Sequence, residues 1–144
     1  MLYINNIPIF VDDVRKDATR SETFQISELL INDPGEPVNW NLSNVKRVGL
    51  QNQNQNKQNL IDKAKIDILY DCSTQYQEFQ RKIGTTREFS LIIFDINSVN
   101  GQRTLLYSCF PPQITKTTVN ATVKRVTAYT DGGQTKLAEL IVQV

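Results

Sequence analysis

Asn32-Asp33-Pro34-Gly35-Glu36-Pro37 divides this chain of 144 residues into an N-terminal helical part and the rest of the domain. Proline followed by glycine suits the two central positions of a type II turn, because glycine accepts the positive φ of the third residue without steric strain. Upstream of this break, apolar residues recur near helical spacing from Val11 to Ile31. The sequence therefore predicts an N-terminal helix that ends at the break and that has a dense apolar stripe only after about Phe24.

Downstream of the break, the pattern alternates between short ordered pieces and polar linkers. Val45 to Leu50 has the composition of a short strand, and the tract from Gln51 to Asn59 lacks apolar periodicity and is predicted to be an exposed loop. Leu60 to Ile83 keeps a helical apolar stripe with an interruption near Ser73. Gly84 is a natural helix stop, so a second helical region should end there.

The apolar period changes after Glu88. Phe89 to Ile96 is almost continuously apolar and rich in β-branched and aromatic residues, which predicts a strand covered on both faces. Asn100-Gly101 indicates a hairpin loop after it, and Asp131-Gly132-Gly133-Gln134 indicates a second turn. The other predicted strands span residues 103–110, 115–129 and 137–144.

Helices first and strands last predict an α+β fold in one domain spanning residues 1–144. We expect the N-terminal helix to pack on a C-terminal antiparallel β-meander of about four strands, with a helical insertion between them. The predicted parts are a helical stem (1–31), a section of turn, short strand, polar loop and helices (32–87), and the antiparallel sheet (88–144).

Composition argues against several functional classes. The chain has no histidine, which is the commonest general base and the commonest metal ligand. Sixteen basic residues are scattered among fifteen acidic ones, so no groove-sized positive field for nucleic acid is evident. We therefore expect no enzymatic activity, no catalytic residues, no cofactor, no metal and no nucleic-acid partner.

Five residues each admit two interpretations. Cys72 and Cys109 can form one disulfide or remain two buried thiols. Trp40 can be a core anchor packed against proline rings or an exposed platform that stacks on a sugar or partner. Asn41 and Asn120 begin Asn-x-Ser/Thr sequons, which either are glycosylated in an extracellular protein or arise by chance in an asparagine-rich chain.

The segment Leu29 to Asn41, followed by Val45 to Leu50, resembles archaeal type IV pilin-like proteins that carry class III signal peptides. In that family a helix runs out through a Pro-Gly-x-Pro-x-x-Trp segment into a strand that ends in Gly-Leu. The residues of this sequence that match the motif are Pro34, Gly35, Pro37, Trp40 and Gly49. The resemblance extends at the level of pattern over residues 24–144, and it implies a pilin-like fold and a structural subunit, major or minor, of a cell-surface filament.

The resemblance also implies a location and partners. Family members begin with a basic peptidase site and a long hydrophobic helix, neither of which is present here, so we expect a soluble fragment or processed form whose missing segment would lead into Leu2 to Val11. Other pilin subunits would bind through the N-terminal helix, cell-surface glycans or proteins would be adhesive partners, and a membrane would be contacted only through the missing segment. The expected location is extracellular. The alternatives are a secreted glycan- or protein-binding module that uses Trp40 and the Gln/Asn-rich loop, and a viral or phage structural protein.

Overall fold

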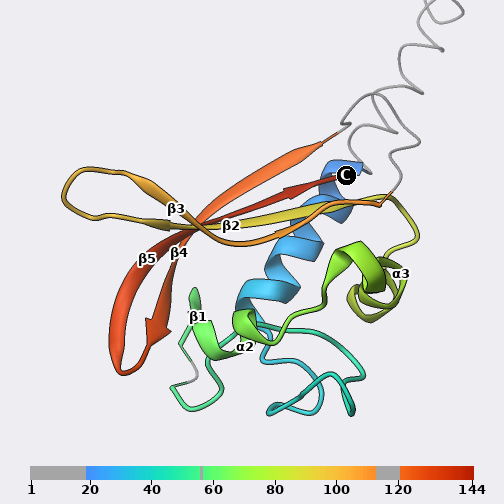
Figure 1. Cartoon of the computed structure of the whole chain (residues 1–144), viewed down its shortest axis with the longest axis horizontal. Coiled ribbons are helices and arrows are strands. Elements are labelled where there is room, and N and C mark those ends of the chain that lie inside the picture. The colour runs from blue at the N-terminus through green and yellow to red at the C-terminus, as the bar shows by residue number, and fades with distance from the viewer. Residues whose placement is uncertain (1–18, 56, 113–120) are drawn as a thin grey trace, which may run out of the picture.

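The N-terminal helix lies against one face of a five-stranded sheet (Figure 1). The structure is a computed structural model that describes residues 19–55, 57–112 and 121–144, and the helix covers residues 19–32 of it. The part of the predicted helix between Val11 and residue 18 lies outside the described residues. Leu30 and Ile31 are buried in one core with Leu140 and Val142 of the sheet. The expected packing of a helix on a sheet is confirmed in that respect.

Sequence chemistry explains how the helix packs and where it ends. Its buried side includes small polar residues, of which Thr23 donates its hydroxyl hydrogen to the carbonyl oxygen of Thr19 at 2.6 Å. A buried hydroxyl satisfied within the helix costs little and lets the helix approach the sheet closely. After residue 32, the side chain of Asp33 accepts the amide hydrogen of Gly35, whose φ of +92° confirms the predicted glycine turn. The chain therefore leaves the helix in a defined direction.

The sheet consists of two antiparallel hairpins and one short additional strand. Its order is β1-β4-β5-β2-β3, and every pairing is antiparallel except the parallel pair of β1 with β4. The strands are β1 (Leu60–Asp62), β2 (Ser90–Ile96), β3 (Arg103–Cys109), β4 (Thr122–Asp131) and β5 (Gln134–Gln143). The four C-terminal strands are antiparallel, as predicted, but β1 adds a fifth strand, and the predicted meander order was wrong because β5 lies between β4 and β2 and joins the two hairpins.

The two faces of the sheet differ in burial. On the face that meets the helix, Leu91 and Ile93 of β2 are fully buried. Ile92 and Phe94, which alternate with them and point to the opposite face, are only half-buried. On the other face, Val126 of β4 keeps 63 % of its surface exposed. The prediction that Phe89 to Ile96 is covered on both faces was therefore wrong, and the strand has the alternation of an antiparallel sheet with one core face.

Two helices connect β1 to β2. These are α2 (Lys63–Asp67) and α3 (Cys72–Ile83), and Gly84 caps α3 in the left-handed conformation, as the sequence predicts. Leu60 to Asp62, predicted as the start of the helical region, instead forms β1. None of the helices in the described part of the chain is long and apolar enough to cross a membrane.

The segment between the proline-glycine break and β1 is held by isolated backbone hydrogen bonds and not by the continuous hydrogen bonding of a β-ladder. Val45 to Leu50 was predicted as a strand, but within it only Arg47 forms a bridge, with Glu36. The Gln/Asn-rich tract that follows is anchored more firmly than predicted. Gln51 and Asn52 are buried, and the side-chain amide of Asn52 donates to the hydroxyl oxygen of Thr130 at 2.9 Å.

Candidate functional site

Four of the five motif residues lie with Asp33 in one interlocked unit at the C-terminal end of the helix, which we call the helix-end knuckle and define as Asp33, Pro34, Gly35, Trp40 and Gly49. Trp40 is 2 % exposed, and its indole N–H donates to the carbonyl oxygen of Gly49 at 2.8 Å. The interpretation of Trp40 as a core anchor is thus confirmed, and that of an exposed stacking platform was wrong.

Both glycines of the knuckle are required by close packing, Gly35 against the Trp40 side chain and Gly49 against the backbone of Asp33. A Cβ on Gly35 would lie 2.5 Å from the Trp40 ring, and a Cβ on Gly49 would lie 2.0 Å from the carbonyl oxygen of Asp33. Pro37 begins the loop that carries Trp40, follows a cis peptide bond, and accepts the Trp40 amide hydrogen at 3.0 Å. The motif therefore encodes a tight backbone crossing that leaves no room for side chains.

Charged groups tie the knuckle together from two sides. The guanidinium of Arg47 lies 2.6 Å from the Asp33 carboxylate, and this hydrogen bond raises the pKa of Arg47. The ammonium of Lys65, on α2, donates to the carbonyl oxygens of Pro34 at 2.6 Å and Gln51 at 2.9 Å. Lys65 is only 5 % exposed, and its burial lowers the pKa to about 8. Sequence reasoning missed Lys65, because no local pattern shows that two backbone carbonyls converge on this position.

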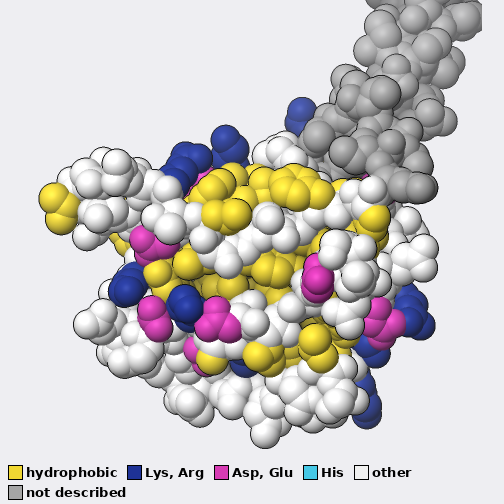
Figure 2. All heavy atoms as spheres, viewed as in Figure 1, with side chains coloured by type: hydrophobic (Ala, Val, Ile, Leu, Met, Phe, Trp, Pro, Cys, Tyr) yellow, Lys and Arg dark blue, Asp and Glu magenta, His cyan; other side chains and the backbone are white. Residues whose placement is uncertain are grey.

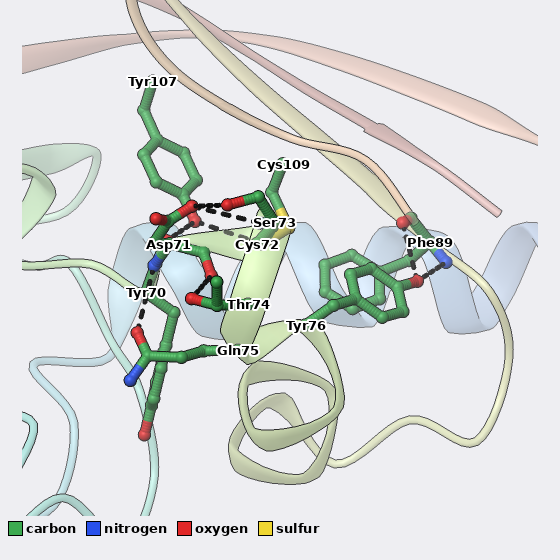
Figure 3. Close-up of a disulfide and its surroundings, with 10 residues drawn as sticks. All are labelled: Tyr70, Asp71, Cys72, Ser73, Thr74, Gln75, Tyr76, Phe89, Tyr107 and Cys109. Atoms are coloured by element: carbon green, nitrogen blue, oxygen red, sulfur yellow. Dashed lines mark hydrogen bonds between the residues drawn. A yellow bond between two sulfur atoms is a disulfide. The ribbon is translucent and has the colours of Figure 1, made fainter. Parts of the chain in front are cut away.

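Of the two interpretations of the cysteines, the disulfide is the one that the structure contains: the Cys72–Cys109 bond joins the first residue of α3 to the last residue of β3 (Figure 3). The hydroxyl of Tyr107 lies 3.6 Å from the Cys72 sulfur and donates to the carbonyl oxygen of Tyr70 at 2.8 Å. Burial raises the pKa of Tyr107 above its ordinary value. The tyrosine hydroxyl is therefore a neutral hydrogen-bonding group at neutral pH.

Next to the disulfide, Tyr76 fastens α3 to the start of the sheet. Its hydroxyl donates to the carbonyl oxygen of Phe89 at 2.9 Å and accepts the amide hydrogen of the same residue at 2.8 Å (Figure 3). The two rings stack with centroids 5.1 Å apart. Burial raises the pKa of Tyr76, so the hydroxyl keeps the proton that it donates. We interpret the disulfide and this pair as bracing, because each polar group already has a partner.

Two of the open hollows on the surface are lined by residues that the structure describes. The larger, about 1110 Å³, follows α3 and is lined by polar side chains such as Gln77 and Arg81 and by Pro111 and Pro112. The smaller, about 470 Å³, lies between the β2–β3 loop and β5 near Lys136. Over the ranges that the structure describes, no group of three or more His, Cys, Asp or Glu side chains is placed to hold a metal ion.

The two sequons differ in what can be said of them. Asn41 lies in an exposed loop between the two halves of the knuckle. Asn120 lies outside the described residues.

The comparisons add no relative, since no family model, curated protein or solved structure matches this chain. The assignment of function therefore depends on the residues and on their geometry.

Proposed function

We propose that this chain is a structural subunit, major or minor, of an archaeal cell-surface filament of the type IV class, with its sheet and loops displayed outward for adhesion. The observation that carries the proposal is the helix-end knuckle. Of the motif residues, Gly35, Trp40 and Gly49 are buried, the Trp40 indole is hydrogen-bonded to Gly49, and neither glycine has room for a Cβ, and this interlocking supports the proposal. Such a unit fixes the angle between a helix and a globular body, which a helix-assembled subunit requires.

The helix also offers a surface on which copies can pack. Its inner stripe is buried against the sheet, but Phe24 and Leu29 are 51 % and 45 % exposed. The guanidinium of Arg125 lies over the Phe24 ring, 5.3 Å from its centroid, which holds that ring in place. On the face shown in Figure 2, acidic and basic side chains surround a central apolar area. Ordered apolar side chains at the surface favour contact with other protein over catalysis.

The disulfide supports an extracellular location. Disulfides form and persist in oxidising compartments, such as the outside of the cell. The Cys72–Cys109 bond closes a loop with a sequence separation of 37 residues and braces the body against unfolding. A subunit exposed on the cell surface benefits from such a constraint.

The proposal is tested in the source cells with a tagged copy of the gene. We expect the chain in the sheared filament fraction, in its oxidised form, and expect deletion of the gene to remove or shorten the filaments. Phe24→Glu with Leu29→Glu should leave folding intact, because both side chains are exposed, and should abolish incorporation into filaments. Gln25→Glu, at a neighbouring exposed position on the helix, is the matched control and should assemble normally.

Two outcomes would contradict different parts of the proposal. Finding the chain only inside cells, with both thiols reduced, would exclude a surface filament. Normal incorporation of the Phe24→Glu/Leu29→Glu variant would exclude assembly through this helix surface.

A further inference from the structure

We propose that Asn41 is a site of N-linked glycosylation, modified by a transferase that uses a lipid-linked oligosaccharide as donor. The inference rests on the proposed function, because only an exported chain meets such a donor. It starts from the loop of residues 41–44, where all four residues are exposed although Trp40 and Val45 on either side are buried. The loop is therefore an arch that projects from two fixed points.

Hydrogen bonds give the arch a defined shape. The carbonyl oxygen of Asn41 accepts the amide hydrogens of Asn44 at 3.2 Å and Val45 at 3.0 Å, and the Asn44 side chain accepts the amide hydrogen of Asn41 at 2.8 Å. These bonds close the turn within a few residues, without help from the rest of the domain. The asparagine is therefore presented to solvent in a short turn, away from helix and strand.

The side chain of Asn41 is oriented for the reaction. Its oxygen Oδ1 accepts the backbone N–H of Ser43 at 2.9 Å and also the Ser43 hydroxyl. Because a backbone N–H can only donate, this contact identifies the oxygen and leaves Nδ2 on the other side of the amide. No hydrogen bond from Nδ2 is present among the described residues. Two donors on Oδ1 withdraw electron density from the amide and make the Nδ2 protons more acidic.

The transfer replaces one bond at the anomeric carbon of the sugar by another. Nδ2 attacks the anomeric carbon of the donor sugar, the bond from that carbon to the lipid phosphate oxygen breaks, and the phosphate leaves with the bonding electrons. One Nδ2 proton passes to a base of the transferase. No oxidant or reductant is needed.

Nearby apolar residues give the glycan a physical role. Val38 and Leu42 flank the asparagine and keep 53 % and 39 % of their surface exposed. A sugar chain on Asn41 would cover both. The loops after the helix lie on the side of the molecule away from the sheet (Figure 1), so a glycan there leaves the sheet face uncovered.

The test uses the full chain, produced and exported by an archaeal host that carries the transferase. Trypsin separates the two sequons, because residues 21–46 form one peptide and residues 117–124 another. We expect mass spectrometry to find the 21–46 peptide increased by the mass of a glycan in most molecules. Ser43→Ala should reduce this fraction at least tenfold, and the conservative Ser43→Thr should retain it.

Three results of this experiment would contradict glycosylation of Asn41. An exported, filament-associated chain whose 21–46 peptide is unmodified overturns the glycan and leaves the proposed function standing. Modification confined to the 117–124 peptide overturns the assignment to Asn41. A modified Ser43→Ala variant would show that the attachment does not depend on this sequon and would also overturn it.

Discussion

Replacing Gly49 by alanine tests whether the helix-end knuckle holds the domain together. A Cβ at this position would lie 2.0 Å from the carbonyl oxygen of Asp33 and 2.4 Å from the amide nitrogen of Gly35. Both are backbone atoms, and real Cβ contacts essentially never fall under 3.0 Å. The two segments would therefore have to separate by about 1 Å, as in other overpacked sites.

The expected cost follows from the contacts that such a shift disturbs. Two hydrogen bonds cross the junction. The Trp40 indole N–H donates to the carbonyl oxygen of Gly49 at 2.8 Å, and the backbone N–H of Gln51 donates to the carbonyl oxygen of Asp33 at 3.2 Å. Each contributes about 1 kcal/mol, and overpacking adds about 1–3 kcal/mol. We expect Gly49→Ala to lower the free energy of unfolding by about 3–5 kcal/mol and Tm by about 6–20 °C, given roughly 2–4 °C per kcal/mol at this chain length.

Urea denaturation followed by fluorescence measures this effect directly, because Trp40 is the only tryptophan and lies in the knuckle. Gly84→Ala is the matched control. A Cβ on Gly84 meets nothing within 4 Å, and only its φ of +91° opposes the substitution, at a cost of about 1–2 kcal/mol. If Gly49→Ala destabilises the domain no more than Gly84→Ala, the steric argument for the knuckle is wrong.

Four further predictions concern the bonds around the knuckle and the disulfide. Reducing Cys72–Cys109 should lower the free energy of unfolding by up to about 3.9 kcal/mol, measured by denaturation with and without reductant. Between pH 8 and 10 stability should rise by up to about 3 kcal/mol, because the folded pKa of Lys65 is about 8 and the unfolded chain then binds a proton that the folded chain does not. Lys65→Met should abolish this rise. Above about pH 10 stability should fall, because burial raises the pKa of Tyr107 and the unfolded tyrosine ionises first. Tyr76→Phe should cost about 1–3 kcal/mol through the loss of two backbone hydrogen bonds, and equal stability in the denaturation assay would contradict their importance.

Local signals in the sequence predicted the features that depend on local chemistry. Gly84 ends α3, Asn100-Gly101 lies in the loop between β2 and β3, and Gly132-Gly133 forms the turn between β4 and β5 with positive φ at both residues. In each case a glycine is placed where a side chain would strain the backbone. These positions could be read from the sequence because their causes lie within a few residues.

The errors occurred where distant partners decide the structure. Leu60 and Ile61 fit a helical stripe or a strand equally well, and their pairing with β4, nearly seventy residues later, makes them a strand. Val45 to Leu50 has no neighbouring strand within the described ranges, and the backbone N–H of Leu50 donates to the carbonyl oxygen of Leu30 instead. In the candidate site, the motif residues were identified but Lys65 was not, because only the folded backbone brings the carbonyl oxygens of Pro34 and Gln51 together.

The place of β5 in the sheet affects when the domain can form. It pairs with β4 on one side and β2 on the other, so residues 134–143 are the seam between two hairpins that do not otherwise pair. Without these residues β2 can pair only with β3, and β4 only with the three residues of β1. The sheet therefore closes in a single step that waits for residues 134–143, and the earlier strands cannot form it by themselves.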